Sequence, residues 1–235
     1  MFIIGQCSPA VVDGTVYIGS SNNNIYAIDA VDGTEKWTYR TGGDADSSPA
    51  VVGGVVYAGS YGGELHAIDA VDGTEKWSYK AGGPIYSSPA VANGVVYVGC
   101  DNGEFYAINA VDGSERWLYR TGDAIRSSPT VVAGVVYVGS YDDNLYAINA
   151  ADGAEKWSYR TRDRINSSPA VVNGTVYIGS TDGNLYAINA LDGSEEWTYT
   201  AGDRIYYSSP ISGADGWCFV NRPGRIGNTE PIDPF

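Results

Sequence analysis

The chain has 235 residues and a formal net charge of −14, from 14 lysine and arginine residues against 28 aspartate and glutamate residues. Such an acidic surface lacks the basic footprint that nucleic acids and anionic membranes require, which argues against both as main partners. No apolar run reaches the roughly 18 residues of a membrane-spanning helix, so no membrane span is predicted.

A 40-residue unit recurs along the chain. Its marker is Ser-Ser-Pro, which appears first as Cys7-Ser8-Pro9 and returns at a fixed spacing until Ser208, where it arrives one residue late. Self-similarity at a fixed period predicts a repeat architecture, here a single domain over residues 1–235. The units are 8–47, 48–87, 88–127, 128–167 and 168–207, followed by a partial sixth at 208–235.

Each unit predicts four short antiparallel strands. In the first unit they cover residues 9–12, 15–20, 24–29 and 35–41, which are rich in β-branched and aromatic residues. The first two strands are joined by Asp13-Gly14, a dipeptide that permits the positive φ of a tight hairpin. Four strands in about 40 residues, repeated around an axis, form a β-propeller blade, so the predicted fold is an all-β propeller.

Each of the five complete units contains a motif with fixed offsets, Ala-x-Asp/Asn-x-x-Asp-Gly-x-x-x-Trp. In the first unit, Gly33 is expected to supply a positive φ and Asp29 to accept hydrogen bonds from backbone N–H groups of the turn. Trp37 is too large for a thin blade, so we expect it to pack against the neighbouring blade, with Ala27 small where a neighbouring indole must fit. The structural docking residues are Trp37, Trp77, Trp117, Trp157 and Trp197, with Gly33, Gly73, Gly113, Gly153 and Gly193.

This motif resembles the tryptophan-docking motif of the pyrroloquinoline-quinone-type (PQQ-type) repeat family, in which threonine usually stands at the position of Asp32. The resemblance extends from residue 8 to about residue 220. It implies a β-propeller, and it favours an extracytoplasmic or cell-surface location. The start of this chain, however, has neither the charge nor the length of a secretion signal.

The resemblance implies two classes of function. Members that act in binding and assembly, such as outer-membrane assembly lipoproteins and kinase sensor domains, suggest a non-catalytic scaffold for a protein or ligand. Quinoprotein dehydrogenases instead hold PQQ over two adjacent cysteines, with Ca²⁺ ligands and an aspartate base on long insertions. Here the cysteines are Cys7, Cys100 and Cys218, and the units are uniform. We therefore predict a scaffold without catalytic residues, metal or cofactor, and keep a quinoprotein relative or fragment that binds PQQ as the alternative.

The expected number of blades is six, with the last irregular or incomplete. Trp217–Val220 matches a second strand, but the remaining sequence has no docking tryptophan. Phe2–Ile4 is the candidate for a missing fourth strand. Five closed blades with a tail is the alternative, and self-association through an incomplete terminal blade is also left open.

Differences among the copies direct the search for a site. The turns that contain Asp-Gly hardly vary, whereas the loops after each fourth strand do, and variable loops on a rigid scaffold commonly carry function. Arginine suits a carboxylate or phosphate and tyrosine can stack on a planar group, so a small anionic ligand is a further alternative to a protein partner. The competing interpretation pairs the arginines with Asp123, Asp163 and Asp203, and His66 is expected to be a packing residue in a tyrosine column. The candidate ligand-binding residues are Arg126, Arg164, Arg204, Tyr86, Tyr206 and Tyr207.

Overall fold

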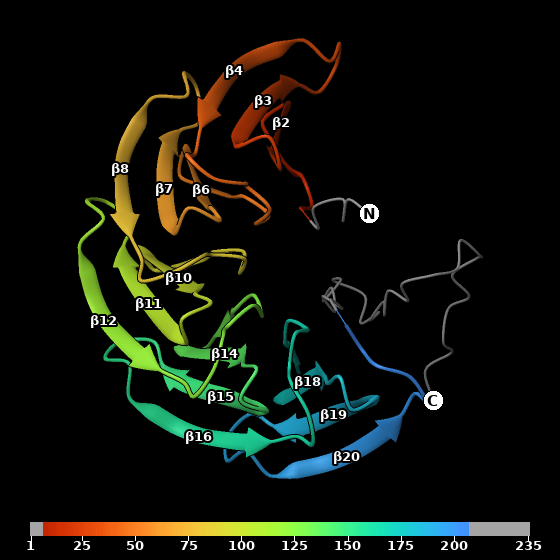
Figure 1. Ribbon diagram of the computed structural model, residues 1–235. Helices are drawn as coiled ribbons and strands as arrows, with labels where there is room; N and C mark the ends of the chain where they lie inside the picture. The colour runs from red at the N-terminus through yellow and green to blue at the C-terminus, as the bar shows by residue number, and fades with distance from the viewer. Residues whose placement is uncertain (1–6, 207–235) are drawn as a thin grey trace.

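A computed structural model gives the fold and describes residues 7–206, all of whose regular structure is β-strand. Five four-stranded antiparallel sheets each keep their strands in chain order. The sheets stand as blades around an arc, with the fourth strand of each blade outermost (Figure 1). Blade 1 contains β1 (Ala10–Val12), β2 (Thr15–Ser20), β3 (Asn24–Asp29) and β4 (Glu35–Arg40); blade 2 contains β5 (Ala50–Val52), β6 (Val55–Gly59), β7 (Glu64–Asp69) and β8 (Glu75–Lys80); blade 3 contains β9 (Ala90–Ala92), β10 (Val95–Gly99), β11 (Glu104–Asn109) and β12 (Glu115–Arg120); blade 4 contains β13 (Thr130–Val132), β14 (Val135–Gly139), β15 (Asn144–Asn149) and β16 (Glu155–Arg160); blade 5 contains β17 (Ala170–Val172), β18 (Thr175–Gly179), β19 (Asn184–Asn189) and β20 (Glu195–Thr200).

The predicted all-β propeller architecture is confirmed, and the strands of the first unit lie where the sequence placed them. The described residues contain five blades, the count of the alternative prediction. The partial sixth unit at 208–235 and the proposed closing strand at Phe2–Ile4 lie outside the described residues.

Two local features shape every blade. Asp13 and Gly14 have φ of 48° and 71°, so the first hairpin turns in the left-handed region, as its sequence predicted. The third and fourth strands pair Ala27 with Trp37 and Ile28 with Glu35, which leaves a β-bulge immediately before the tryptophan. The same irregularity recurs in all five blades. The bulge lets an outward-facing charged residue precede a tryptophan that points into the space between blades.

The docking tryptophan joins each blade to the next. The Trp37 indole lies so close to Gly73 of blade 2 that a Cβ added there would stand 2.8 Å from the ring. Its Nε1 donates a hydrogen bond to the Ala70 carbonyl at 3.1 Å, and the Tyr17 hydroxyl donates to the same oxygen at 3.0 Å. Two features of position 73 therefore require glycine: its φ of 74° and the close approach of the Trp37 ring.

We expected Ala27 to make room for an indole of the neighbouring blade, and this expectation was wrong. Ala27 is opposite Trp37 of its own blade and belongs to the same buried cluster, whereas the neighbouring blade receives that indole at its glycine turn. The small side chain therefore makes room for the cross-strand indole of the same sheet.

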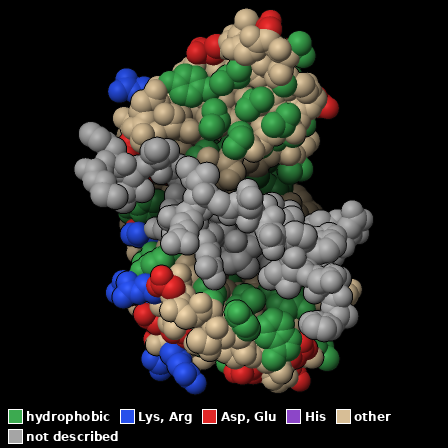
Figure 2. Space-filling model, turned by 90° about the vertical axis from the view of Figure 1, so that its right-hand side faces the viewer, with side chains coloured by type: hydrophobic (Ala, Val, Ile, Leu, Met, Phe, Trp, Pro, Cys, Tyr) green, Lys and Arg blue, Asp and Glu red, His purple; other side chains and the backbone are tan. Residues whose placement is uncertain are grey.

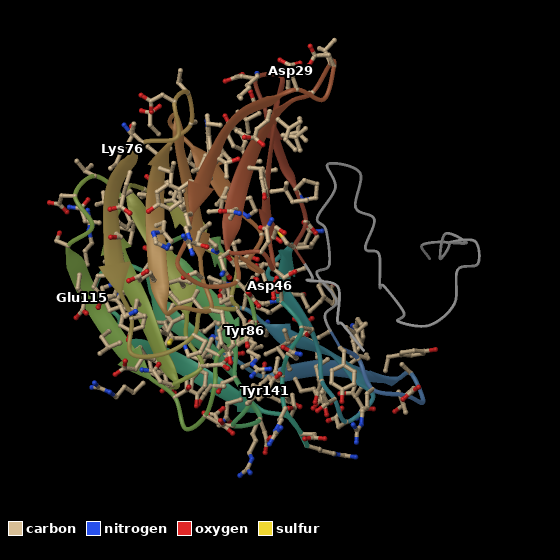
Figure 3. All side chains as sticks on the ribbon, turned by 45° about the horizontal axis from the view of Figure 1, so that its top comes forward. Asp29, Asp46, Lys76, Tyr86, Glu115 and Tyr141 are labelled. Carbon is tan, nitrogen blue, oxygen red and sulfur yellow. The ribbon has the colours of Figure 1, made fainter. Side chains whose placement is uncertain are left out.

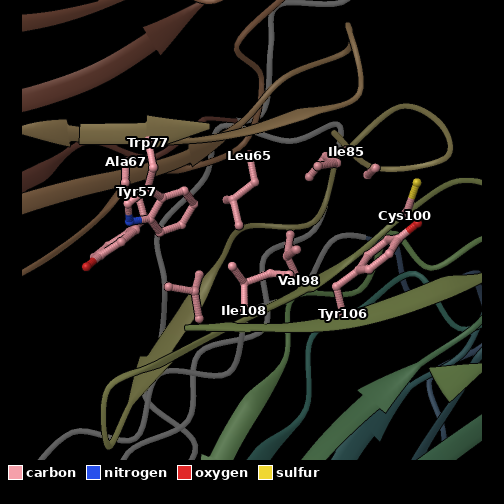
Figure 4. Packing of buried hydrophobic residues seen from close by; sticks show 11 residues of the cluster. Tyr57, Leu65, Ala67, Trp77, Ile85, Val98, Cys100, Tyr106 and Ile108 are labelled. Carbon is pink, nitrogen blue, oxygen red and sulfur yellow. The ribbon is translucent and has the colours of Figure 1, made fainter. Parts of the chain in front are cut away.

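We call the face of a blade that bears its docking tryptophan the trailing face, and the face that receives the preceding tryptophan the leading face. Four buried hydrophobic clusters each combine one trailing and one leading face. Figure 4 shows the cluster between blades 2 and 3, where Leu65 and Trp77 lie opposite Val98 and Ile108. The core of this protein is therefore a series of interfaces between blades, because each thin sheet is covered only by its neighbours.

His66 is a buried histidine whose ring packs against Tyr39 beside the cluster between blades 1 and 2. It takes the place of a tyrosine on the leading face of blade 2, is 3% exposed, and has no hydrogen-bond partner for Nε2. Its Nδ1 lies 3.1 Å from the Tyr39 hydroxyl and 3.6 Å from Glu75 Oε2, while Glu64 Oε2 lies 3.9 Å from Nε2. Burial lowers the pKa of His66 below its ordinary value, although Glu64 and Glu75 oppose the shift.

Replacing an internal docking tryptophan should destabilise the protein more than replacing the terminal one. Trp117 is 9% exposed and Trp197 is 44% exposed. We expect Trp117→Ala to lower the free energy of unfolding by about 3–5 kcal/mol, because it leaves a cavity between two blades. Trp197→Ala should lower it by under about 2 kcal/mol, since a half-exposed ring loses less transfer free energy. Urea unfolding followed by circular dichroism compares the two, and equal losses would contradict the docking scheme.

His66→Tyr should make the protein less sensitive to acid. A histidine whose pKa is lowered on folding takes up protons preferentially when unfolded, so the native chain loses stability as the pH falls below about 6.5. Tyrosine does not titrate there, and three of the other four blades bury a tyrosine at this position. The free energy of unfolding of His66→Tyr minus that of the native chain should grow between pH 7.5 and pH 5. Parallel pH profiles for the two proteins would show that His66 is protonated equally in the folded and unfolded states.

Candidate functional site on the loop face

The loop face is the side of the arc formed by the turns after each second strand and the loops after each fourth strand. Backbone hydrogen bonds hold each loop to the next blade's turn, as in Tyr141 N to Ala124 O at 2.9 Å and Thr181 N to Arg164 O at 2.9 Å. The loops therefore lie over the interfaces between blades. The blades fix the positions of the loop backbone from which the side chains extend. The face comprises residues 21–23, 41–49, 61–63, 81–89, 101–103, 121–129, 141–143, 161–169, 181–183 and 201–206.

Arg126 is anchored at the seam between blades 3 and 4. Its Nε and Nη2 each donate to an oxygen of Asp101 at 2.8 Å, a bidentate pair that raises the pKa of Arg126. The guanidinium lies 4.6 Å from the centre of the Tyr86 ring and 5.2 Å from that of Tyr141. Burial, and then the proximity of Tyr61, raise the pKa of Tyr86 to about 12. Arg126 is thus held between two tyrosine rings and a carboxylate. Its guanidinium holds these side chains in place and is not free to bind a ligand.

A hollow of about 270 Å³ opens beside this cluster, over blades 4 and 5. Arg164 lies with its guanidinium 5.2 Å from the centre of the Tyr141 ring, and Arg204 Nη1 donates to the Tyr206 hydroxyl at 2.8 Å. Both arginines are exposed, whereas Tyr141 and Tyr206 are half-buried. The hollow is lined by Tyr141, Asp163, Arg164, Thr181, Arg204 and Tyr206.

The structure therefore places the predicted residues in two groups. Arg164, Arg204 and Tyr206 line the hollow. Arg126 lies beside it through its contact with Tyr141, and Tyr86 contacts Arg126. Tyr207 lies outside the described residues. Tyr141 and Thr181 were not predicted from the sequence. The available signal was the variation at the first residue of the turn after each second strand, which is serine, tyrosine, aspartate, tyrosine and threonine in the five units.

The loop aspartates do not pair with these arginines as the competing interpretation expected. Asp123 Oδ1 accepts from Ala124 N at 2.7 Å, Asp163 Oδ1 from Arg164 N at 2.9 Å, and Asp203 Oδ1 from Arg204 N at 2.7 Å. Among residues 7–206, the ion pair of Arg126 is with Asp101 of the adjacent turn. The aspartates cap loop N–H groups instead, because the short side chain is already beside its own chain.

Asp46 and Tyr86, each of which directly precedes a Ser-Ser-Pro, lie toward the inner side of the arc. Figure 3 shows Asp46 and Tyr86 there, with Tyr141 farther along the same rim. Asp46 Oδ1 and both side-chain polar atoms of Asn166 are buried without a hydrogen-bond partner. Burial, followed by the proximity of Asp44, raises the pKa of Asp46.

The described thiols occupy separate structural positions. Cys100 Sγ donates to the Gly83 carbonyl at 3.0 Å, and Cys7 Sγ approaches the Ser47 carbonyl at 3.4 Å. They do not form the adjacent pair that the resemblance implies for a quinone, so the residues do not fit that group. In residues 7–206 there is no group of three or more histidine, cysteine or acidic side chains arranged to hold a metal ion. The same span contains no helix that is long and apolar enough to cross a membrane.

Solved structures with the same fold show 15–20% sequence identity, which supports the fold alone. BamB from Moraxella catarrhalis superposes with a TM-score of 0.77 and 20% identity, over 88% of this chain and 68% of that one. The computationally designed Ika8 protein gives a TM-score of 0.79 and 15% identity, over 88% of this chain and 65% of that one. The chain thus spans about two thirds of the length of each structure. A search of curated protein sequences found no match.

Family assignment comes from the sequence profile. The family model described as outer membrane protein assembly factor BamB matches residues 4–88 and 82–213, which is most of the chain. The matched region contains all five blades and their docking tryptophans. The chain belongs to the BamB-like family of PQQ-repeat propellers.

Proposed function

We propose that this chain is a non-catalytic scaffold that binds a protein partner on its loop face. The observation that carries the proposal is the hollow over blades 4 and 5, where Arg164, Arg204, Tyr141 and Tyr206 meet. None of these side chains takes part in the tryptophan docking between blades. They can therefore serve recognition without loosening the series of interfaces between blades that holds the fold.

The chemistry of the hollow favours an acidic side chain beside a planar one. Arginine forks bind carboxylates through two parallel hydrogen bonds, and tyrosine rings supply rigid contact area with a polar edge. Because the whole chain carries a net charge of −14, long-range attraction of an acidic partner is weak, and binding must depend on short-range contacts. An acidic peptide segment that also carries an aromatic residue fits these requirements.

The family name supports a protein partner, since it describes an outer membrane protein assembly factor. It also supports an extracytoplasmic location at a cell envelope. A small anionic ligand in the same hollow is the second candidate, because the paired arginines would bind a free carboxylate or phosphate through the same contacts.

The test compares two variants that lose the same charge. Arg164→Gln/Arg204→Gln removes the guanidinium groups of the hollow, and Arg116→Gln/Lys156→Gln removes two exposed positive charges on outer strands. The probe is a panel of fluorescent peptides with alternating glutamate and tyrosine, measured by anisotropy with phosphate and acetate as competitors. We expect the hollow variant to raise the Kd of the bound peptides by about tenfold or more, because it removes charge-assisted hydrogen bonds.

The control variant should leave the peptide Kd unchanged. An equal loss in both variants would show that only overall charge matters, and no binding of any peptide would count against a peptide partner. Complete competition by millimolar phosphate or acetate would favour the small anionic ligand instead.

A further inference from the structure

A row of tyrosine rings and guanidinium groups crosses the loop face from blade 2 to the hollow. The rings of Tyr61 and Tyr86 meet edge to face, with their centres 5.5 Å apart. The Arg126 guanidinium lies 4.6 Å from the centre of the Tyr86 ring and 5.2 Å from that of Tyr141. The Arg164 guanidinium in turn lies 5.2 Å from the centre of the Tyr141 ring. We call these five side chains the stacked row.

The two arginines of the stacked row differ in how their charge is balanced. Two cations over one ring repel each other unless one of them is neutralised. Arg126 is neutralised, because its Nε and Nη2 each donate to an oxygen of Asp101 at 2.8 Å. Arg164 takes part in none of the ion pairs within residues 7–206. Its positive charge is therefore available to a partner.

Arg164 is the member of the row that opens onto the hollow with its cation. Its guanidinium lies over the Tyr141 ring, and its exposed side chain lines the hollow. A guanidinium is planar, so one that rests on a ring with one face presents the other face to its surroundings. Arg126 shows this use of both faces, since its guanidinium contacts Tyr86 as well as Tyr141. An aromatic ring that enters the hollow can stack on Arg164 in the same way.

The charges of the hollow place a carboxylate beside such a ring. Two arginines and one aspartate line the hollow, and Asp163 Oδ1 already accepts from Arg164 N at 2.9 Å. Arg204 Nη1 donates to the Tyr206 hydroxyl at 2.8 Å, which holds the fork of Arg204 at the edge of the hollow. Seen from the open side of the arc, the lysine and arginine side chains in view lie along one edge, whereas acidic side chains lie on both (Figure 2). Positive charge is thus local in a chain whose net charge is −14.

Arg126 contacts Tyr141 but does not itself line the hollow. We propose that Arg126 is a positioning residue, which holds the Tyr141 ring against the Arg164 guanidinium. The hollow then selects a partner segment whose aromatic ring stacks on Arg164 while a neighbouring carboxylate pairs with Arg204. Both parts rest on the proposed function and add to it the chemical feature that is recognised and the residue that sets the preference.

The test measures the preference of the hollow for an aromatic ring. The probes are two fluorescent peptides in which glutamate alternates with phenylalanine or with cyclohexylalanine, so that they have the same charge and side chains of similar size. We expect the native chain to bind the phenylalanine peptide about fivefold more tightly, because only an aromatic ring gains the cation–π attraction.

Arg126→Lys keeps a positive charge beside Asp101 but removes the planar group that lies over two rings. It should reduce the preference for phenylalanine to less than about twofold, although position 126 does not line the hollow. Arg120→Lys is the matched control, since Arg120 Nη2 also pairs with a carboxylate at 2.8 Å, that of Glu104, and neither residue lines the hollow. This control should keep the full preference.

Tyr141→Leu distinguishes positioning through the ring from a general effect on the fold. If Arg126 acts through Tyr141, Arg126→Lys should change the preference no further in the Tyr141→Leu background, because the two changes then remove the same contact. Circular dichroism of each variant checks that the blades remain folded.

The outcomes that would overturn these proposals are distinct. Equal Kd values for the two peptides in the native chain, with binding still weakened by Arg164→Gln/Arg204→Gln, would overturn the stacking and leave the proposed function standing. The same loss of preference in Arg126→Lys and Arg120→Lys, or a further loss in the Tyr141→Leu background, would overturn the positioning role of Arg126. Absence of binding by both peptides would overturn the proposed function and the stacking together.

Discussion

The contact of an indole with a glycine turn on the next blade is the interaction on which this structure depends. It fixes the distance between sheets, since a ring such as that of Trp37 fills the space above Gly73 and its Nε1 bonds Ala70 O at 3.1 Å. It also fixes direction, because each blade carries a tryptophan on one face and a receiving turn on the other. The same contact repeats from blade to blade. Among the described blades, the first and the last therefore differ from the middle three, which have a neighbouring blade on both faces.

The docking contact uses only one side of each blade and leaves the loops on the opposite side free for recognition. The turn that receives the indole must keep its glycine and its aspartate or asparagine, as seen in blade 2 where Val71 N donates to Asp69 Oδ1 at 2.9 Å. The opposite side of each blade carries no part of the docking contact, and its loops differ from one copy to the next. Arg126 shows the result: it is built into a seam by Asp101, while Arg164 and Arg204 a blade or more away remain at the surface.

Much of the architecture could be predicted because the repeat is local. Strand positions, hairpin turns and the glycine φ depend on residues close in sequence, and five copies strengthened each signal. The candidate site could be predicted only in part. Arg164, Arg204 and Tyr206 were found through their unusual residue types, but Tyr141 was missed because it reaches the hollow from another blade. The competing pairing of Arg126 with Asp123 failed because Asp101, 25 residues away in the same unit, forms the bidentate ion pair instead.

The sequence by itself determined the repeat, the strand order within each blade and the family to which the chain belongs, because period, turn dipeptides and docking motif are properties of one unit. Only the tertiary structure decided which side chains meet. It placed Ala27 against its own blade's indole, buried His66 between Tyr39 and Glu75, and joined three predicted residues in one hollow. These outcomes depend on the stacking of one blade on the next, which brings together residues from different units at distances that no single unit encodes.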